Sequence, residues 1–459
     1  MVPAMSGRLS ARGAALEALR RTGAGTTFLR DHLHAVFDRT PLTPRDRALA
    51  TQLASGTVRH RRTLRRLLSH VRGEPGGAEA IQPDLRILLE LGAFQLLFLD
   101  RVPAYAAVNE AVDEAGRAAG KKAAGFVNAM LRSVGRLVVG RDTDADPAPD
   151  ALPHPEGGVV RLGAAVLPDP QANRTGFLGA AYSYPDWLVA RWLDTLGDGA
   201  EAVCRWGNRR PRTYARVNPM RHDAADLLRT LQAEAPDVAE GPRPGSIDVS
   251  ALSARRLEAL IHRGDLTVQD PSAMAAVEAL APEAGETVLD LCASPGTKTT
   301  QIVEAMGESG AVVAADRSDE KLRPIRRTLA ARGIENATVC LSAEVNAAAP
   351  AGGFDAVLVD VPCSNTGVLA RRVEARWRVR PKDVSELVHL QSDLLRVAAA
   401  CVRPAGRLVY STCSSLTDEN EGVLETFLNG HDDWALDGQD LILPGPDHDG
   451  AFHALLRRR

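Results

Sequence analysis

Apolar residues in the first third of the chain recur every three or four positions, the spacing of one face of an α-helix. Alanine and leucine dominate there and β-branched clusters are few, which also favours helix. A cap residue, Thr43, precedes a helix-starting proline, Pro44. Residues 1–140 are therefore expected to form an all-α domain. The pattern predicts helices at 12–21, 26–38, 44–71, 85–99, 106–119 and 122–138.

The helical periodicity then stops. Residues 141–172 contain six prolines, several glycines and an acidic run, so we expect a linker. Residues 173–262 alternate between helix and strand, which predicts a small α+β domain. Its expected elements are helices at 184–196 and 224–233 and strands at 212–217 and 246–249.

From residue 263 to residue 459, short apolar runs alternate with longer amphipathic segments. This alternation predicts a Rossmann-like, doubly wound parallel sheet. One run, residues 357–359, has no polar position at all, as in strands covered on both faces. The expected strands are 287–292, 311–315, 337–341, 356–360 and 406–412, and the expected helices are 298–307, 319–332 and 383–402.

Two of these strands are followed by residues whose side chains could take part in catalysis. Asp360 and Cys363 follow the run at 357–359, and Cys413 follows the strand at 407–412. If the strands are parallel neighbours, their axes lie about 4.8 Å apart. The three side chains would then converge at the carboxyl edge of the sheet, where open α/β sheets place their ligands.

A third candidate is the turn after the strand at 287–292. Small residues link that strand to a helix, and such turns let a nucleotide-like ligand approach the backbone. Asp316 ends the next strand, twenty residues after Gly296, and an acid at that spacing commonly binds ribose hydroxyls. The turn is neither G-x-G-x-x-G nor a Walker sequence, which disfavours dinucleotides and triphosphates.

Composition places the chain among ordinary globular proteins of several domains, with 459 residues, 45% hydrophobic and 25% charged. It has no apolar run of eighteen residues and no secretory signal at its start, so we expect no membrane contact. Six cysteines without paired spacing indicate reduced thiols and a cytoplasmic location.

Charge is distributed unevenly. Residues 1–140 hold 21 Lys and Arg against 12 Asp and Glu, or +9, whereas the remainder holds 34 against 46, or −12. This asymmetry favours a basic module that meets a polyanion, and its densest part is residues 59–66. The alternative is chance combined with a solvated helix face.

Together the motifs resemble the RsmB (Sun/Fmu) family of S-adenosylmethionine-dependent RNA cytosine-5 methyltransferases, over nearly the full length. The cysteine motifs at 360–364 and 411–414 are highly specific as a pair. The other matching segments are 44–49, 56–59, 91–96, 102–104, 107–112, 126–132, 216–218 and 268–272.

The resemblance implies a NusB-like RNA-binding domain and a cytosine in small-subunit (16S) rRNA as the target. It implies that Cys413 is the nucleophile at carbon 6, that Cys363 assists release, and that Asp360 hydrogen-bonds the base. We expect no metal and a monomer. The implied S-adenosylmethionine contacts are Cys292, Ala293, Ser294, Pro295, Gly296, Thr297, Lys298, Asp316 and Asp360.

Two positions depart from the family pattern. Gly296-Thr297 stands where relatives carry Gly-Gly, and residues 341–344 lack the aspartate that relatives often place after the third strand. The third cofactor contact, near Ser342 or Glu344, is therefore not assigned.

Other candidates have plainer interpretations. Cys204, Cys292, Cys340 and Cys401 are expected to be inert core thiols. The acidic and histidine-containing tail at 447–453 is a weak metal candidate, better explained as a turn before the last strand. Trp377 and its neighbouring arginines (371, 372, 376, 378 and 380) are interpreted as an RNA-backbone contact rather than a solvated cluster.

Two rival functions stay open. The same chemistry could act on tRNA, although the NusB-like domain argues against it. A non-catalytic RNA-binding assembly factor is the other, although such a module needs neither Cys363 nor Cys413.

Overall fold

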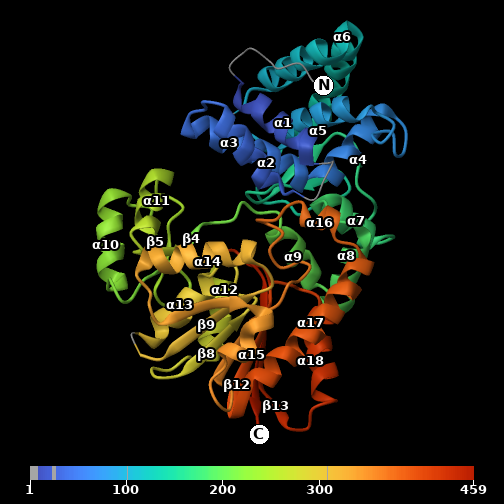
Figure 1. Cartoon of the computed structure of the whole chain (residues 1–459). Coiled ribbons are helices and arrows are strands. Elements are labelled where there is room, and N and C mark those ends of the chain that lie inside the picture. Colours follow the sequence, from blue (N-terminus) through green and yellow to red (C-terminus); the bar gives the residue numbers. More distant parts are fainter. Residues whose placement is uncertain (1–8, 23–26, 101, 308) are drawn as a thin grey trace. The chain divides into compact units, whose positions relative to one another are not determined.

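The computed structural model describes residues 9–22, 27–100, 102–307 and 309–459 (Figure 1). The chain divides into two compact units, Met1–Arg209 with Arg376–Arg378, and Arg210–Ala375 with Val379–Arg459. Within the described residues, no helix has the length and apolar character needed to cross a membrane.

The first unit is built mainly from helices, as the N-terminal pattern predicted. Its helices are α1 (Ala11–Thr22), α2 (Leu29–Arg39), α3 (Pro44–Arg59), α4 (Arg61–Arg72), α5 (Pro83–Phe98), α6 (Ala104–Leu137), α7 (Arg174–Tyr182), α8 (Asp186–Leu196) and α9 (Gly199–Trp206). Thr43 caps α3 by accepting a hydrogen bond from the Asp46 amide at 3.1 Å. The start of the helix predicted at 26–38 lies outside the described residues.

Two helix boundaries differ from the prediction. The helix expected over 44–71 is broken at His60, whose buried ring stacks on Phe98 with centroids 4.4 Å apart. The helices expected at 106–119 and 122–138 form one element, α6, with a bend at Gly120, where φ is +83°. Only glycine adopts that conformation without strain, so the bend marks the predicted interruption.

The segment 141–172, expected to be a linker, contains ordered strands. β1 (Val138–Asp142), β2 (Ala151–Pro153) and β3 (Val159–Leu162) form an antiparallel sheet in the order β1-β3-β2. Five apolar side chains of β2 and β3 are buried, which explains why this proline-rich stretch is ordered: Ala151, Leu152, Val159, Val160 and Leu162. The prolines lie in connections or at a strand end, where no ladder amide is required.

Helices α7 to α9 belong to the first unit, whereas the sequence assigned them to the small domain beginning at residue 173. The reason is their contact with α4. The Thr63 hydroxyl donates to the Ala180 carbonyl at 2.7 Å, and the Arg62 amide donates to the Ser183 hydroxyl at 2.9 Å. These bonds join positions more than a hundred residues apart, which periodicity does not reveal.

Residues 376–378, in the short helix α16 (Ala375–Arg378), are also part of the first unit. The Arg376 guanidinium is buried, donates to Asn208 Oδ1 at 2.6 Å and to the Gly207 carbonyl at 2.9 Å, and lies 4.2 Å from the Tyr184 ring centroid. Trp377 donates its indole N–H to a carbonyl of α3 at 2.8 Å. The expected RNA contact is therefore wrong for Arg376, whose side chain is enclosed by protein.

The second unit begins with a small four-stranded sheet. Its strands β4 (Tyr214–Val217), β5 (Ala239–Glu240), β6 (Ser246–Asp248) and β7 (Leu266–Val268) lie in the order β5-β6-β4-β7, with all neighbours antiparallel. Helices α10 (Ala224–Glu234) and α11 (Ala254–His262) pack on it through Leu227, Leu231 and Leu260. The strand and helix alternation predicted an α+β domain here, and the structure has one.

The larger sheet has seven strands in the order β10-β9-β8-β11-β12-β14-β13. The five predicted strands are present and parallel to one another, but the sheet is mixed because β14 runs antiparallel between β12 and β13. The last two strands form a hairpin, which needs no crossover helix. The strands are β8 (Thr287–Leu291), β9 (Ala311–Asp316), β10 (Ala337–Leu341), β11 (Phe354–Asp360), β12 (Val402–Thr412), β13 (Trp434–Ile442) and β14 (Ala451–Arg458).

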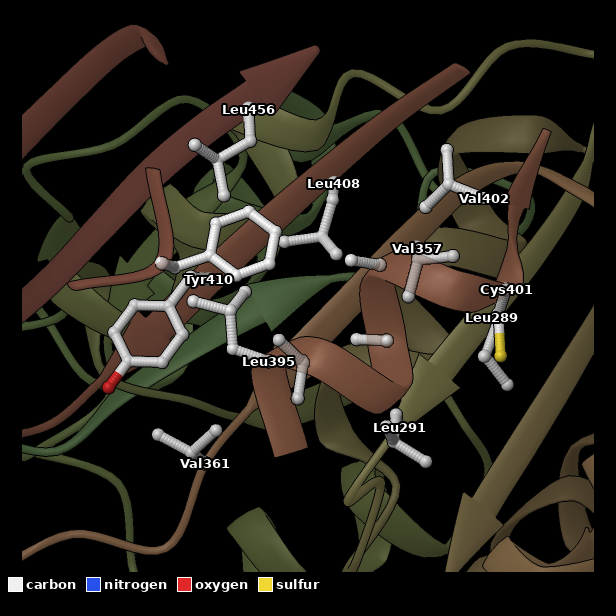
Figure 2. Packing of buried hydrophobic residues seen from close by; sticks show 14 of the residues in the cluster. Leu289, Leu291, Val357, Val361, Leu395, Cys401, Val402, Leu408, Tyr410 and Leu456 are labelled. Atoms are coloured by element: carbon white, nitrogen blue, oxygen red, sulfur yellow. The ribbon is translucent and has the colours of Figure 1, made fainter. Parts of the chain in front are cut away.

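Helices cover both faces of this sheet. One face packs on α12 (Pro271–Leu280), α13 (Thr297–Met306) and α14 (Asp319–Arg332), and the other on α15 (Val345–Ala348), α17 (Pro381–Cys401) and α18 (Glu421–Leu428). Figure 2 shows Val357, Leu408 and Tyr410 of the second face packed with Leu395 of α17. Residues 357–359 are fully buried, which confirms that the apolar run is a strand covered on both sides.

Candidate active site

The register of β11 and β12 brings the two cysteine motifs together. The strands are parallel, with Asp360 opposite Ser411, so the residues after them leave the same edge of the sheet. Cys363 and Cys413 are partly buried free thiols with their sulfur atoms 3.0 Å apart. The Cys413 amide also donates to Cys363 Sγ at 3.3 Å. Two motifs fifty residues apart thus place their thiols in contact.

This contact changes the acidity of Cys363. The hydrogen bond with Cys413, followed by burial and by the negative charges of Cys413 and Glu419, raises the pKa of the Cys363 thiol well above its ordinary value. When two coupled groups share an environment in this way, loss of one proton makes loss of the second harder. The contact between the two sulfur atoms therefore favours the protonated form of Cys363.

Asn365 completes the surroundings of the thiols, and the sequence analysis did not identify it. Its backbone has φ +62°, a left-handed conformation that asparagine tolerates better than most residues. Its side-chain amide donates to the Cys363 carbonyl at 2.9 Å, and its Oδ1 lies 3.5 Å from Cys413 Sγ. The only sequence signal was an asparagine directly after a Pro-Cys-Ser turn.

The loop that carries Cys363 then passes very close to two other segments. The Gly367 amide donates to the Cys413 carbonyl at 3.0 Å, and the Gly450 amide donates to the Gly367 carbonyl at 2.8 Å. A Cβ atom at Gly367 would lie 2.7 Å from the Gly450 carbonyl oxygen and 2.9 Å from that of Cys413. The backbones approach so closely that neither glycine leaves space for a side chain.

Lys298 and Asp360 form an ion pair beside the thiols, with Nζ 2.6 Å from Oδ2. Burial lowers the pKa of Lys298, but the charge and hydrogen bond of Asp360, with smaller contributions from Asp290 and Cys413, outweigh burial and raise it. The Lys298 ammonium therefore stays protonated and places a positive charge near the thiols. Asp360 keeps about a third of its side chain exposed, so it can meet a ligand as well as the lysine.

The predicted cofactor turn lies between β8 and α13. Gly296 has φ +101° and its Cβ position lies 3.4 Å from Ile325, so the turn requires glycine. The Ala293 amide donates to the Ala315 carbonyl of β9 at 3.0 Å, and the Ser294 amide donates to Asp316 Oδ2 at 3.1 Å. The structure thus brings Asp316 directly against residues 292–298.

Asp290, near the end of β8, contacts the first turn of the helix that follows the cofactor turn. It is fully buried, and the Thr299 hydroxyl donates to its Oδ2 at 2.6 Å. Burial raises its pKa to about 7, only partly opposed by Thr299 and Lys298. Asp290 therefore fastens the first turn of α13 to the strand.

The second departure from the family pattern, at residues 341–344, lies at the end of β10. Residues Ser342–Glu344 form one 3-10 turn, in which Glu344 accepts the Leu341 amide at 3.0 Å. This bond ties Glu344 to its own turn and provides no evidence for a cofactor contact.

Four other thiols are not members of the Cys363–Cys413 pair. Burial is the first cause that raises the pKa of Cys204, Cys292, Cys340 and Cys401. For Cys292 the pKa rises to about 12, which makes this thiol a poor nucleophile. Inert behaviour is thus consistent with their surroundings.

The tail considered as a metal candidate is tied through Asp449 to the segment that follows the Cys363 motif. Arg371 donates to Asp449 Oδ2 at 2.5 Å, to Asp270 Oδ2 at 2.8 Å and to the Arg212 carbonyl at 2.8 Å. Arg371 is thus engaged by protein groups, although it was predicted to contact RNA. In the part of the chain that the structure describes, no group of three or more His, Cys, Asp or Glu side chains could hold a metal ion.

Comparison with known proteins identifies the chain as a methyltransferase. A solved structure described as a methyltransferase homolog protein from Pyrococcus horikoshii has a TM-score of 0.56 and 23% identity, covering 62% of this chain and 99% of that one. The family described as 16S rRNA methyltransferase RsmB/F matches residues 277–447, the NusB family matches 9–136, and the ferredoxin-like domain of RsmF/B-like methyltransferases matches 184–247.

Full-length relatives define the family more narrowly. The probable ribosomal RNA small subunit methyltransferase B of Synechocystis is 32% identical over 98% of this chain and 100% of its own length. The protein of the same description from Bacillus subtilis is 32% identical over 94% of this chain and 90% of its own. The chain belongs to the RsmB family of ribosomal RNA small subunit methyltransferases, as its motifs indicated.

Proposed function

We propose that this protein transfers a methyl group from S-adenosylmethionine to carbon 5 of a cytosine in 16S rRNA, through a covalent adduct on Cys413. The observation that carries the proposal is the 3.0 Å contact between the Cys363 and Cys413 sulfur atoms, beside the Lys298–Asp360 pair. Carbon 5 of cytosine is a poor nucleophile until a group adds to carbon 6. Thiolate suits that task because it adds readily and leaves readily near neutral pH.

In this scheme the Cys413 thiolate forms a bond to carbon 6, and the ring electrons move toward nitrogen 3. In the proposed reaction Asp360 hydrogen-bonds the edge of the base, while the neighbouring Lys298 ammonium offsets the negative charge that develops there. Carbon 5 then takes the methyl group that bound S-adenosylmethionine supplies. These are the roles that the resemblance implied for Cys413 and Asp360, and Lys298 gains an electrostatic role.

Cys363 completes the reaction by removing the proton at carbon 5, after which the electron pair of that C–H bond expels Cys413. The main causes that raise the Cys363 pKa are its hydrogen bond to Cys413, burial and the Cys413 charge. Once the Cys413 sulfur is bonded to carbon 6, its charge is gone and that hydrogen bond is weakened. The Cys363 thiol then ionises more readily, at the stage when a base is needed.

The turn at 292–298 and Asp316 are the proposed S-adenosylmethionine contacts. The turn fits this ligand because small residues leave its backbone open and because Asp316 lies against it. A carboxylate there can accept hydrogen bonds from two neighbouring ribose hydroxyls.

Asp316→Ala is expected to weaken S-adenosylmethionine binding by about 1–3 kcal/mol, through loss of charge-assisted hydrogen bonds. Titration calorimetry of the full-length protein would measure the dissociation constant. Asp319→Ala, on the exposed side of α14, is the matched control and should bind as the unmodified protein does. A folded Asp316→Ala variant with unchanged affinity would remove Asp316 from the site.

The rRNA target is supported by the names of the relatives and by the NusB match over the basic N-terminal helices. The tRNA alternative has no comparable support among these matches, and a purely RNA-binding protein would not need two thiols in contact. We expect the first unit to supply affinity and placement, and the second to supply the chemistry.

Bisulfite sequencing of 16S rRNA tests the proposal directly. RNA from cells that lack the gene should lose protection at one cytosine, and the restored gene should return it. A gene carrying Cys413→Ser should fail to return it. If every 16S cytosine keeps its protection in the deleted strain, the proposed target is wrong.

A further inference from the structure

Behind the two thiols lies a buried carboxylate that the proposed reaction does not use. Glu419 ends the 3-10 turn η2 (Thr417–Glu419), which follows the Cys413 motif, and its side chain is fully buried. Its Oε1 accepts the Ser364 amide and the Gln391 side-chain amide, each at 2.9 Å. Its Oε2 accepts the hydroxyls of Ser414, at 2.5 Å, and Ser364. Four donors therefore converge on one carboxylate.

These donors come from three segments that are distant in sequence. Ser364 directly follows Cys363, and Ser414 directly follows Cys413. Gln391 lies on α17, and its amide donates both to Glu419 and to the Pro362 carbonyl, at 2.9 Å each. One side chain thus ties both cysteine loops to each other and to a core helix.

The hydroxyl groups leave little freedom in this network. Because Ser364 and Ser414 both donate to Glu419, the single Thr366 hydroxyl proton is donated to one of their oxygens or shared between them, at 3.1 Å and 3.0 Å. Thr366 in turn accepts the Ser415 amide at 3.0 Å, and Ser414 accepts the Leu416 amide at 3.0 Å. These hydrogen bonds hold the backbone on both sides of the thiols.

A carboxylate is the side chain suited to this place. An ionised glutamate only accepts hydrogen bonds, whereas glutamine would turn an amide group toward two of the donors. Burial of a charge is costly, and charge-assisted hydrogen bonds of this kind offset that cost. An apolar side chain could fill the core without burying a charge, so packing alone does not explain a glutamate at this position.

We infer that Glu419 is a positioning residue for the methyl-transfer reaction, which holds the Cys363 and Cys413 loops at the spacing that the two thiols require. This inference rests on the proposed two-cysteine reaction. Glu419 touches neither sulfur in the hydrogen-bond network and acts through Ser364 and Ser414. Its negative charge is also one of the causes that raise the Cys363 pKa.

The test compares Glu419→Gln with Glu425→Gln, the same change at an exposed position of α18, in the full-length protein. The first readout is single-turnover methylation of 16S rRNA at saturating S-adenosylmethionine. Displacement of reacting groups by about 1 Å can slow a reaction by about 100-fold, and we expect a loss of that order for Glu419→Gln alone. S-adenosylmethionine affinity should stay at its original value in both variants, because Glu419 does not touch the 292–298 turn.

The second readout needs no RNA and no activity. Alkylation of Cys363 by iodoacetamide is followed against pH, with the modified peptide measured by mass spectrometry. Removal of the Glu419 charge should move the Cys363 profile to lower pH, while Glu425→Gln leaves it in place. The failure of this inference is distinguishable from the failure of the two-cysteine reaction. If Glu419→Gln shifts the Cys363 alkylation profile but Cys413→Ser still methylates RNA, the loop contacts are upheld and the two-cysteine reaction is rejected.

Ser364→Ala and Ser414→Ala keep the carboxylate and remove one hydroxyl donor each. They replace Glu419→Gln as the test of the inference if that variant does not fold. Each should slow single-turnover methylation without changing S-adenosylmethionine affinity. If Glu419→Gln folds and both readouts match the unmodified protein, the inference is overturned. It is equally overturned if the fold is lost and neither serine variant slows the reaction.

Discussion

Replacement of Cys413 by serine is expected to abolish methylation while leaving RNA and S-adenosylmethionine binding intact. A serine hydroxyl is almost wholly protonated at neutral pH and adds poorly to carbon 6. The substitution keeps the size of the side chain and a hydrogen-bonding group beside Cys363 and Asn365. Methyl transfer to 16S rRNA, measured alongside filter binding of the RNA, separates the lost chemistry from the retained binding.

Replacement of Cys363 by alanine should have a different result. Addition and methyl transfer would proceed on Cys413, but elimination would stall because no base removes the proton at carbon 5. The protein should accumulate as a covalent adduct with methylated RNA. This adduct is seen as a shifted band that resists denaturant and requires S-adenosylmethionine.

The double variant is the control for this pair and should give no band. Cys401→Ala, a buried thiol outside the active site, should neither trap RNA nor change its methylation. An adduct that forms with Cys413→Ala and disappears with Cys363→Ala would reverse the two roles. If both variants stay active and neither traps RNA, the covalent scheme fails for this protein.

Stability of the second unit should depend strongly on Glu304. This glutamate of α13 binds Arg216 of β4 at 2.5 Å and Arg332 of α14 at 2.9 Å, and all three side chains are buried. Arg216 also donates to Gln269 Oε1 at 3.1 Å, and Arg332 donates to Thr267 Oγ1 at 2.7 Å. The three charges thus join the small sheet to the helices that follow the cofactor turn.

Glu304→Ala would leave two buried guanidinium groups facing each other without their shared acceptor. Breaking a buried ion pair by removing one partner typically costs about 3–5 kcal/mol, and the expected loss here is of that order. Hydrogen exchange of β11 and β12 peptides reports the opening free energy of this unit without contribution from the first one.

Glu278→Ala is the matched control, since Glu278 pairs with Arg243 on a more exposed part of the same unit. Exposed ion pairs contribute about 0–1 kcal/mol, so exchange should change little. Equal exchange in the two variants would show that the buried triad does not stabilise the unit.

Much of the catalytic sheet was predictable because its signals are local. The apolar run at 357–359 specifies a strand by itself, and the parallel partner at 407–412 has a run of the same kind. Once both strands are neighbours, their register brings the Cys363 and Cys413 loops to the same edge of the sheet. The small-residue turn at 292–298 was visible for the same reason, since glycine at 296 is required by its own backbone.

The features that the sequence did not predict depend on contacts between residues that are far apart in the chain. Glu419 accepts hydrogen bonds from residues 28 and 55 positions away, and nothing beside it in sequence distinguishes it from a surface acid. Arg376 similarly looked like a nucleic-acid contact until its partners near residue 208 were known. The strands at 138–162 were missed because prolines mark turns in sequence without showing that short strands pair between them.

The close approach of the two backbones at Gly367 and Gly450 affects how the results of substitutions in this family are interpreted. A systematic scan of variants would find both positions intolerant of nearly every residue, as at the thiols themselves. Neither glycine has a side chain to offer to RNA or to a cofactor, so lost activity there would report a lost fit between two backbones. A position can thus be as sensitive as a nucleophile although it takes no part in the chemistry.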